Sequence, residues 1–340
     1  MTRKSDFLAW AGLAVGNYPL ADPTIRFIRH SENLTFLVTE KSARQKYLLR
    51  LHKPFTVNFL DERQQPGVIE SELLWMDTLR GEAGLPLQPV IRSREEQLVT
   101  SIHLPGSDEQ VACSLLGWVP GRSYRPDLSN LDRLARQLGR LMASMHNQAS
   151  AWRPPEAFRR PRQGADAIRQ TLEKLAPAVQ MGILQPQDYA VLRHTVLLIL
   201  EQVALLPQTP ANWGLIHADL HTGNWLHRRD QVIPIDFSLC GYGYHLFDIA
   251  TCAGSLGADH PALRHHFLDG YQECRHLPAG FPRLLEPFFV ASVLGYYAFV
   301  LPDPGHHEWI STHLPRFVET VCRKLLCGEE FFLPRSGSLD

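Results

Sequence analysis

Residues of the types that serve phosphoryl transfer stand close together in LIHADLHTGNWL (215–226): His217, Asp219 and Asn224. A further carboxylate, Asp236, follows the apolar run QVIPI. Phosphoryl transfer needs a carboxylate that accepts or orients the proton of the nucleophile, and oxygen ligands that hold Mg²⁺ against the phosphates. An Asn carbonyl and an Asp carboxylate suit this hard cation. The H-x-D-x-x-x-x-N spacing, with an Asp after the next apolar run, therefore predicts a phosphotransfer site.

Each of these residues has a simpler interpretation when it is taken alone. Asp219 and Asn224 are common turn formers, and Asp236 could merely end a strand. The combination is more specific, because the spacing, the following hairpin and a preceding β-rich region occur together. We therefore favour the phosphotransfer interpretation.

The chain before residue 117 is expected to be a small β-rich lobe. Its apolar runs are short, rich in β-formers and separated by polar turns, which predicts an antiparallel meander. A helix is expected near 66–82, where apolar residues recur at helical spacing. The strands are predicted at 24–30, 34–40, 46–52, 97–102 and 111–116.

The second part of the chain is expected to be mainly helical. GWVPGR (117–122) is a plausible hinge, 131–147 carries a clear apolar helical stripe, and 152–164 is expected to be a loop. Further helices are predicted near 165–179, 187–206, 245–256, 260–275, 283–301 and 314–326. The sequence thus predicts a bilobal α+β fold with a ligand cleft between the lobes. Its boundaries are predicted at 1–116 for the first lobe, 117–122 for the hinge, 123–334 for the second lobe and 335–340 for a tail.

Composition excludes several other classes of protein. The 340 residues carry a formal net charge of −1, so no basic field invites nucleic acid. Six Cys form no CxxC pair, which favours reduced thiols in a cytoplasmic protein. The start of the chain is expected to form a short amphipathic helix through Leu8, Gly12 and Val15 rather than a signal peptide. The apolar run 288–301 is too short to span a bilayer and is expected to be a core helix, so no membrane partner is predicted.

The stretch 215–250 resembles the phosphotransferase family of aminoglycoside phosphotransferases, choline kinases and type II homoserine kinases, which share the protein-kinase-like fold. The resemblance extends over most of the chain and is weak between 150 and 212. It also includes HSENLTF (30–36), YLLRLHKP (47–54), ESELLWMDTL (70–79), LLGWVPGR (115–122) and LARQLGRLMASMHNQ (134–148).

The resemblance implies a role for residues in both lobes. Asp219 would be the catalytic base, and Asn224 and Asp236 the metal ligands. Arg50 would hold the phosphates of the nucleotide, and Glu72 would orient Arg50. Arg is suited to this task because it is always charged and can contact two phosphate oxygens. The alternative is that Arg50 and Glu72 form an ordinary surface ion pair, which would contribute little to stability.

The first lobe would then be the nucleotide-binding lobe. Ser31 and Asn33 could donate hydrogen bonds to phosphate, although an ordinary hairpin turn is an equal alternative. The adenine would lie near Leu116 and Trp118. Ser238 departs from the family pattern after the metal-binding Asp, which weakens any inference about a protein-kinase type of activation switch.

The resemblance implies an ATP- and Mg²⁺-dependent transfer of the γ-phosphate to a small-molecule hydroxyl. The acceptor stays open among hydroxy amino acids such as homoserine, amino alcohols, sugars and aminoglycosides. One alternative is a Ser/Thr protein kinase, which the short segment 236–250 disfavours. Another is a non-catalytic pseudokinase, which the intact set Asp219, Asn224 and Asp236 disfavours.

Several other polar residues are expected to be structural. His217 should be a buried brace of the loop, and Asp248 should accept backbone N–H groups that fix it. His221 and His227 do not combine with His217 at a zinc-ligand spacing. The Arg-rich stretch 153–162 is expected to be a solvated loop.

Overall fold

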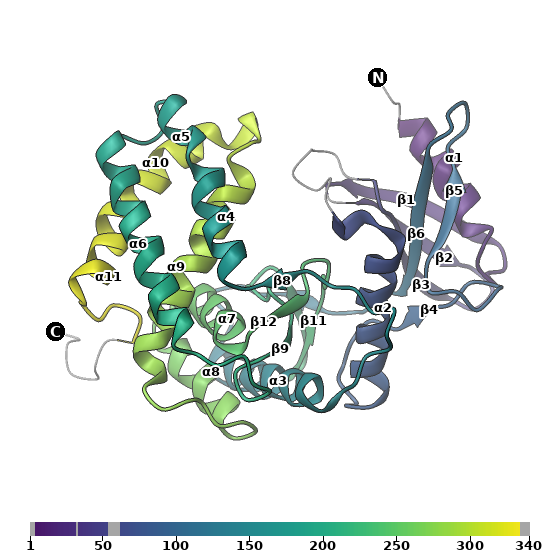
Figure 1. Ribbon diagram of the computed structural model, residues 1–340. Helices are drawn as coiled ribbons and strands as arrows, with labels where there is room; N and C mark the ends of the chain where they lie inside the picture. Colours follow the sequence, from purple (N-terminus) through teal and green to yellow (C-terminus); the bar gives the residue numbers. More distant parts are fainter. Residues whose placement is uncertain (1–3, 32, 54–61, 334–340) are drawn as a thin grey trace. The chain divides into compact units, whose positions relative to one another are not determined.

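The computed structural model describes residues 4–31, 33–53 and 62–333, in two compact units (Figure 1). The N-terminal unit comprises Met1–Gly121 and Arg153–Pro161, and the C-terminal unit comprises Arg122–Trp152 and Arg162–Asp340. The division at 121/122 lies inside the stretch expected to be a hinge. The segment 153–161, expected in the second lobe, belongs to the N-terminal unit. The predicted tail, 335–340, lies outside the described residues.

The N-terminal unit is built on an antiparallel sheet in the order β1-β2-β3-β6-β4, with β5 paired to β6. The strands are β1 Pro23–His30, β2 Leu34–Glu40, β3 Gln45–Leu51, β4 Val90–Ile91, β5 Thr100–His103 and β6 Gln110–Gly117. The predicted antiparallel meander is therefore confirmed in β1, β2 and β3. The two-residue β4 is too short to show the alternation that predicts a strand.

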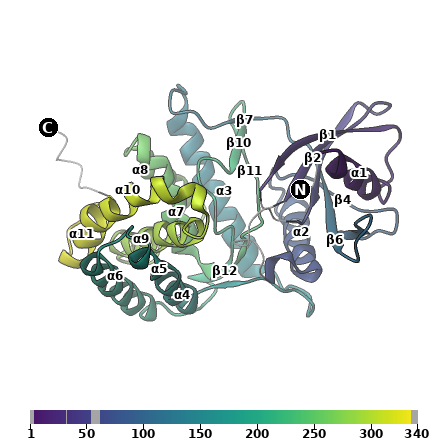
Figure 2. The same ribbon diagram turned by 90° about the horizontal axis from the view of Figure 1, so that it is seen from above.

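The two faces of this sheet carry different side chains because residues alternate along each strand. One face, which includes Leu49 and Cys113, packs on helix α1 (Lys4–Val15). The opposite face carries Arg50 on β3 and Ser114 on β6, which are register partners. Arg50 also contacts Glu72 of helix α2 (Pro66–Gly81). The helix expected at 66–82 is thus confirmed, and α1 is a second helix of the unit (Figure 2).

The expected helix at the start of the chain is present, but its buried side was predicted wrongly in part. Trp10, Ala11, Ala14 and Val15 are buried, whereas Leu8 is 39% exposed. The helix is apolar on several sides, so apolar spacing does not single out the face that meets the sheet.

The Arg-rich loop is less solvated than expected. Arg160 is buried and donates to the carbonyl of Val68, and the backbone N–H of Arg159 donates to the Ser71 hydroxyl. Both acceptors lie on α2, which explains why 153–161 belongs to the N-terminal unit.

The C-terminal unit is mainly helical. Its helices are α3 Leu131–Ala151, α4 Ala165–Leu175, α5 Pro177–Gln180, α6 Pro186–Ala204, α7 His245–Asp259, α8 Leu263–Gln272, α9 Phe281–Val300, α10 His307–Phe317 and α11 Arg323–Cys327. Two short sheets, β11-β10-β7 and β8-β12-β9, accompany them. Their strands are β7 Arg122–Ser123, β8 Arg162–Gln163, β9 Trp213–Ile216, β10 Trp225–Arg228, β11 Gln231–Pro234 and β12 Gly241–Tyr244. The predicted α+β fold class is thus confirmed.

Helices α3 and α8 pack with their backbones in direct contact. A Cβ on Gly139 would lie 2.0 Å from the carbonyl oxygen of Phe267, and a Cβ on Gly270 would lie 1.9 Å from that of Arg136. Only glycine fits at both positions. This close packing brings Tyr271 of α8 against His146 of α3.

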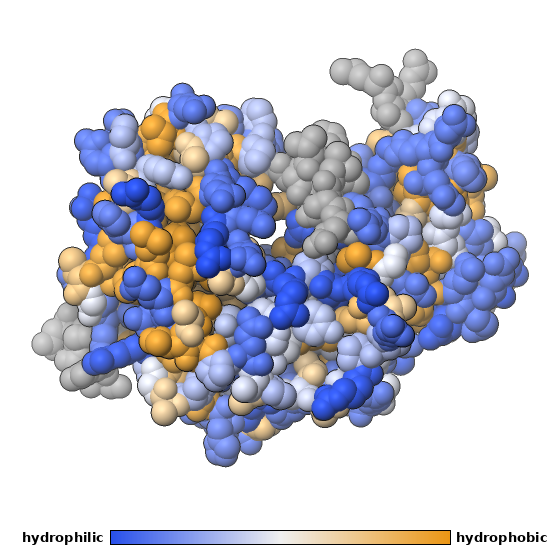
Figure 3. All heavy atoms as spheres, viewed as in Figure 1, coloured by the Kyte–Doolittle hydropathy of each residue, from blue (hydrophilic) through white to orange (hydrophobic). Residues whose placement is uncertain are grey.

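Helix α9 is the one described helix that is long and apolar enough, by length and composition, to cross a membrane. It packs against α4, α6 and α7, and 56% of its most apolar stretch is buried. Figure 3 shows hydrophobic residues, in orange, gathered on one face of this unit. Leu197 and Leu205 are among its exposed apolar residues. Burial within the unit agrees with the predicted core helix. The helix expected at 314–326 is instead α10, a π-helical turn at Val318–Cys322 and α11.

Candidate active site

The loop between β9 and β10 is held by a buried carboxylate from helix α7. Asp248 Oδ2 accepts the backbone N–H of His217 at 2.8 Å, and Oδ1 accepts that of Ala218 at 2.7 Å. Ala218 adopts a left-handed backbone (φ 67°), which is costly for a residue other than glycine. The two charge-assisted bonds offset this cost. The predicted role of Asp248 is therefore confirmed.

His217 is fully buried and braces the loop, as predicted. Its Nδ1 accepts the backbone N–H of Asp219 at 3.3 Å, and its Nε2 lies 3.1 Å from the carbonyl oxygen of Ile235. Burial lowers the pKa of His217, so the ring is neutral near pH 7. A neutral ring with both nitrogens engaged fixes the positions of Asp219 and Ile235.

Asn224 and Asp219 form one hydrogen-bonded pair at the end of this loop. The Asn224 amide Nδ2 donates to Asp219 Oδ2 at 2.7 Å and to the Asp219 carbonyl oxygen at 2.9 Å. The side chain of Asp219 is 33% exposed, so solvent or a substrate can reach it. Because the NH₂ group of Asn224 is used in this way, its side-chain carbonyl is the part that can coordinate a cation.

Asp236 follows β11 and is tied to the same loop. The backbone N–H of Ile235 donates to the carbonyl of Asn224 at 2.9 Å, which fixes the chain just before Asp236. Asp236 has a left-handed backbone (φ 64°), the second such site residue after Ala218. Ser238, the departure from the family pattern, donates its hydroxyl to Asp236 Oδ1 at 2.8 Å.

The donor set formed by Asn224 and Asp236 fits a hard divalent cation. Both offer oxygen, and Mg²⁺ in particular usually takes one or two carboxylates while keeping water and substrate phosphates as its other ligands. Within the described part of the chain, no group of three or more His, Cys, Asp or Glu is placed to hold a metal. A site built from one carboxylate and one amide therefore depends on phosphate oxygens to complete it.

A second layer of buried polar residues supports Asp248. His146 Nε2 lies 3.3 Å from Asp248 Oδ2, and His146 Nδ1 lies 2.9 Å from the hydroxyl of Tyr271. The ring of His146 stacks on His245 with centroids 4.3 Å apart. Burial lowers the pKa of His146 well below its usual range and that of His245 to about 2. No spacing in the sequence singles out these residues, although His146 is one of the buried residues of α3.

These buried histidines predict that the C-terminal unit loses stability in acid. The pKa of His146, His217 and His245 is lowered in the folded state, so the unfolded chain binds more protons below about pH 6.5. The stability they contribute is complete above that pH and is lost as the pH falls. The expected slope is about 1.4 kcal/mol per pH unit for each histidine. Burial raises the pKa of Asp248, which opposes part of this loss.

Urea unfolding at several pH values between 5 and 8 measures this slope. The His245→Gln variant removes one of the titrating groups and should show a shallower slope than the unmodified chain. A free energy of unfolding that does not fall between pH 6.5 and 5 would contradict the assignment of neutral buried histidines.

In the N-terminal unit, Arg50 and Glu72 form a buried ion pair rather than the surface pair considered as the alternative. Arg50 Nη1 lies 2.8 Å from Glu72 Oε1, and their side chains are 7% and 3% exposed. Arg50 Nε donates to the Ser114 hydroxyl at 3.2 Å, and His52 Nε2 lies 2.9 Å from the same oxygen. Ser114 and His52 lie 62 residues apart in the chain, so no local pattern pointed to them. Their contacts fix the direction of the guanidinium group.

The residues predicted at the phosphate turn form a self-bonded hairpin. The backbone N–H of Ser31 donates to the carbonyl of Asn33 at 3.2 Å, and the Thr35 hydroxyl approaches the same carbonyl. The Asn33 side-chain oxygen is buried, and no described residue donates to it. The geometry is that of a closed turn, and the role of Ser31 and Asn33 toward phosphate stays a prediction.

The two residues predicted to contact adenine differ in the solvent exposure of their side chains. Leu116 is buried, whereas Trp118 is 40% exposed. The backbone N–H of Trp118 donates to the Lys46 carbonyl, and the Gly117 carbonyl accepts from the Gln88 side chain. These backbone groups are already bonded within the unit. Any contact of Trp118 with a base would therefore use its ring or its carbonyl.

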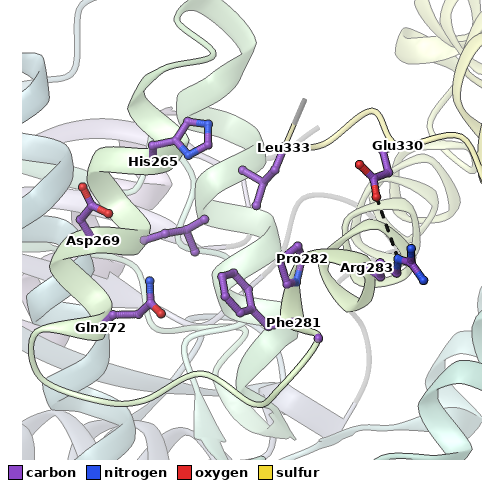
Figure 4. A pocket seen from close by; sticks show the side chains of 10 residues that line it. His265, Asp269, Gln272, Phe281, Pro282, Arg283, Glu330 and Leu333 are labelled. Carbon is purple, nitrogen blue, oxygen red and sulfur yellow. Dashed lines mark ion pairs between the residues drawn. The ribbon is translucent and has the colours of Figure 1, made fainter. Parts of the chain in front are cut away.

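The C-terminal unit contains a pocket of about 630 Å³ (Figure 4). None of the residues that line it belongs to the predicted site. Its charged groups are largely paired, because Asp269 binds Arg136 and Arg283 lies 3.9 Å from Glu330. It is lined by His265, Leu268, Asp269, Gln272, Gly280, Phe281, Pro282, Arg283, Glu330 and Leu333.

The antiparallel sheet of the N-terminal unit, the helical C-terminal unit and the β9–β10 loop define the class of proteins with the protein-kinase-like fold. Residues 24–286 match the model of the phosphotransferase enzyme family. The chain belongs to this family, and it is a phosphotransferase. The resemblance inferred from the sequence is thereby confirmed.

Individual relatives agree with this assignment. The chain is 22% identical to amicoumacin kinase of Bacillus subtilis (strain 168) over 289 residues, 81% of this chain and 79% of the relative. It is similar in structure to a microcompartment-associated aminopropanol kinase (TM-score 0.78, 23% identity, 96% of this chain and 99% of the other). It is also similar to an amicoumacin kinase solved with AMP-PNP, Ca²⁺ and Ami (TM-score 0.74, 17% identity, 94% and 95% covered).

Proposed function

We propose that this phosphotransferase moves the γ-phosphate of ATP, with Mg²⁺, to a hydroxyl group of a small molecule in the cytoplasm. The observation that carries the proposal is the pair Asp219–Asn224, whose loop is tied to the residue before Asp236 by the hydrogen bond from the Ile235 N–H to the Asn224 carbonyl. The named relatives support the choice of a small acceptor, since they are kinases of aminopropanol and amicoumacin. Amino alcohols are therefore the first acceptors to test.

The proposed reaction assigns one task to each residue. The acceptor oxygen forms a bond to the γ-phosphorus, the bond from that phosphorus to the bridging oxygen of ADP breaks, and the hydroxyl proton passes to Asp219. Asn224 keeps Asp219 Oδ2 oriented through the 2.7 Å hydrogen bond and offers its carbonyl to the cation together with Asp236. Bound Mg²⁺ would neutralise the negative charge that develops on the phosphates.

Arg50 is proposed to hold the phosphates of the nucleotide. Its guanidinium has a fixed direction, since Glu72 and Ser114 both bind it in a buried environment. A preoriented cation loses little entropy when it contacts a phosphate. The proposal for Arg50 rests on this geometry and on its place in the third strand of the sheet.

The alternatives are less well supported. A protein kinase needs an extended activation segment to form a peptide platform, and here residues 237–240 alone separate Asp236 from β12. A pseudokinase would not need Asp219 and Asn224 to be paired so closely.

A screen of ATP consumption tests the proposal. Purified protein with Mg·ATP would be assayed against amino alcohols, hydroxy amino acids, sugars and aminoglycosides, with EDTA and acceptor-free reactions as controls. ATP consumption that depends on a small acceptor supports the proposal. Consumption that appears with protein substrates alone would favour the protein-kinase alternative.

Replacing Arg50 by Ala should impair both catalysis and folding. Loss of the cation is expected to lower kcat/KM for ATP by about tenfold or more, and the uncompensated buried Glu72 should cost about 3–5 kcal/mol of stability. Activity should be measured per folded molecule, at a temperature where circular dichroism shows the native state.

The Arg92→Ala variant is the matched control in the same unit. Arg92 pairs with Asp77 at 3.3 Å, and the side chains are 43% and 38% exposed. It should change stability by less than about 1 kcal/mol and leave turnover unaltered. Arg50→Ala kinetics equal to those of this control would reject the role of Arg50.

A further inference from the structure

His221, two residues after Asp219, has a ring that is fixed in place by its own loop. Its Nδ1 accepts the backbone N–H of Gly223 at 3.0 Å. A Cβ on Gly223 would lie 2.6 Å from Cε1 of His221, so the ring rests directly on the glycine. The ring therefore has a defined direction even though the side chain is 45% exposed.

The hydrogen of the His221 ring is directed by this arrangement. Because Nδ1 is an acceptor, the ring hydrogen of the neutral imidazole lies on Nε2. His221 Nε2 lies 3.8 Å from Asp219 Oδ2, which is beyond hydrogen-bond length. The N–H is therefore beside the proposed base without being consumed by it.

We propose that His221 is a further catalytic residue, whose Nε2–H donates a hydrogen bond to a non-bridging oxygen of the phosphoryl group during transfer. This inference rests on the proposed function. An acceptor hydroxyl must come within about 2.6–3.2 Å of Asp219 to lose its proton. The phosphorus is partly bonded to that hydroxyl oxygen in the transition state, so the phosphoryl oxygens come close to a donor located beside Asp219.

The phosphoryl oxygens are a better partner for this donor than the acceptor hydroxyl. Negative charge is spread over the three equatorial oxygens in the transition state, and a preoriented donor stabilises charge without reorganisation. A hydrogen bond to the attacking oxygen would instead withdraw electron density from the nucleophile. A donor of this kind lowers the barrier, whereas a purely structural His221 would affect only the shape of the loop.

Two substitutions separate the donor from the structural brace. In His221→Asn the side-chain oxygen can replace Nδ1 as the acceptor for Gly223, but no donor reaches the Nε2 position. In His221→Gln the amide NH₂ can reach the Nε2 position, but the acceptor near Gly223 is lost. His265→Asn, on the exposed side of α8, is the control for a histidine outside the site.

We expect His221→Asn to keep wild-type stability and KM values and to lose about 10²-fold in kcat, a typical loss for one such donor. His221→Gln should retain more activity than His221→Asn even if it is less stable. A His221→Gln protein that is as inactive as His221→Asn, or two variants with normal kcat, would overturn the inference.

A binding measurement separates this inference from the proposed function. ADP with Mg²⁺ and aluminium fluoride mimics the planar phosphoryl group, and its affinity can be measured by calorimetry. We expect His221→Asn to bind this mixture about 10²-fold more weakly than wild type, while binding of Mg·ADP alone is unchanged. Equal affinity of both proteins for the mixture would reject the role of His221 alone. A wild-type protein that binds neither nucleotide mixture would reject the proposed function, and the role of His221 with it.

Discussion

Asp219→Asn is expected to lower the rate of phosphoryl transfer by about 10²–10⁴-fold, the usual contribution of a general base. The fold should survive, because the amide oxygen of the new side chain can still accept the hydrogen bond from Asn224 Nδ2. Asp219 is not proposed to bind the cation, so Mg·ATP should bind nearly as well as to the wild type. Single-turnover assays and calorimetric titration measure the two effects separately.

Asp230→Asn is the matched control for this change. Asp230 lies between β10 and β11, is 51% exposed and pairs with Arg133 at 2.7 Å. The same chemical change at this exposed position should leave transfer unaltered. Near-normal turnover of Asp219→Asn on the acceptor would remove Asp219 from the mechanism.

Asp236→Asn is expected to act on nucleotide binding instead. It replaces the charged oxygen ligand of the proposed cation site by a neutral one, which should weaken Mg·ATP binding by at least about tenfold, or about 1.4 kcal/mol. The backbone at this position has φ 64°, a conformation that Asn adopts more readily than most residues. A loss of affinity would therefore reflect the lost charge rather than unfolding.

Titration of Mg·ATP and of ATP with EDTA distinguishes cation binding from nucleotide binding. Ser238→Ala, which removes the hydroxyl that donates to Asp236 Oδ1, should weaken Mg·ATP binding less than Asp236→Asn does. If Asp236→Asn bound Mg·ATP as tightly as the wild type, the cation site would have to lie elsewhere.

The residues that sequence spacing could identify are those that lie on one local element. Asp219 and Asn224 share a single loop, and Asp236 follows on the next hairpin, so their proximity is encoded by a short stretch of chain. Asp248 lies in the first turn of the next helix and could be predicted for the same reason. The strands β1, β2 and β3 were also predictable, since each is a short run rich in β-forming residues and bounded by polar turns.

The supporting residues could not be predicted because they come from distant segments. His146 lies 102 residues from Asp248 and 125 residues from Tyr271, and the packing of α3 on both α7 and α8 brings the three together. Ser114 meets Arg50 through the pairing of β3 with β6, at a separation of 64 residues. A pattern read along one chain contains no information about such pairs.

His221 illustrates a different limit. Its spacing from His217 and His227 matches no zinc site, so the sequence predicts no metal-binding role for it. Its proposed role depends on which nitrogen carries the hydrogen, and that follows from the hydrogen bond between Nδ1 and the backbone N–H of Gly223. The spacing of residues along the chain does not show which ring nitrogen is an acceptor.

The most direct test of the role of Asp219 follows the transfer of labelled phosphate from γ-labelled ATP to an acceptor hydroxyl. The amount of labelled product is compared between the wild type and Asp219→Asn. We expect the wild type to form a phosphate monoester of a small acceptor in a reaction that EDTA abolishes. Asp219→Asn should bind the same Mg·ATP and form about 10²-fold less product or lower. Equal amounts of product from both proteins would contradict the proposed mechanism. So would a wild-type protein that binds Mg·ATP but transfers phosphate to no acceptor in the screen.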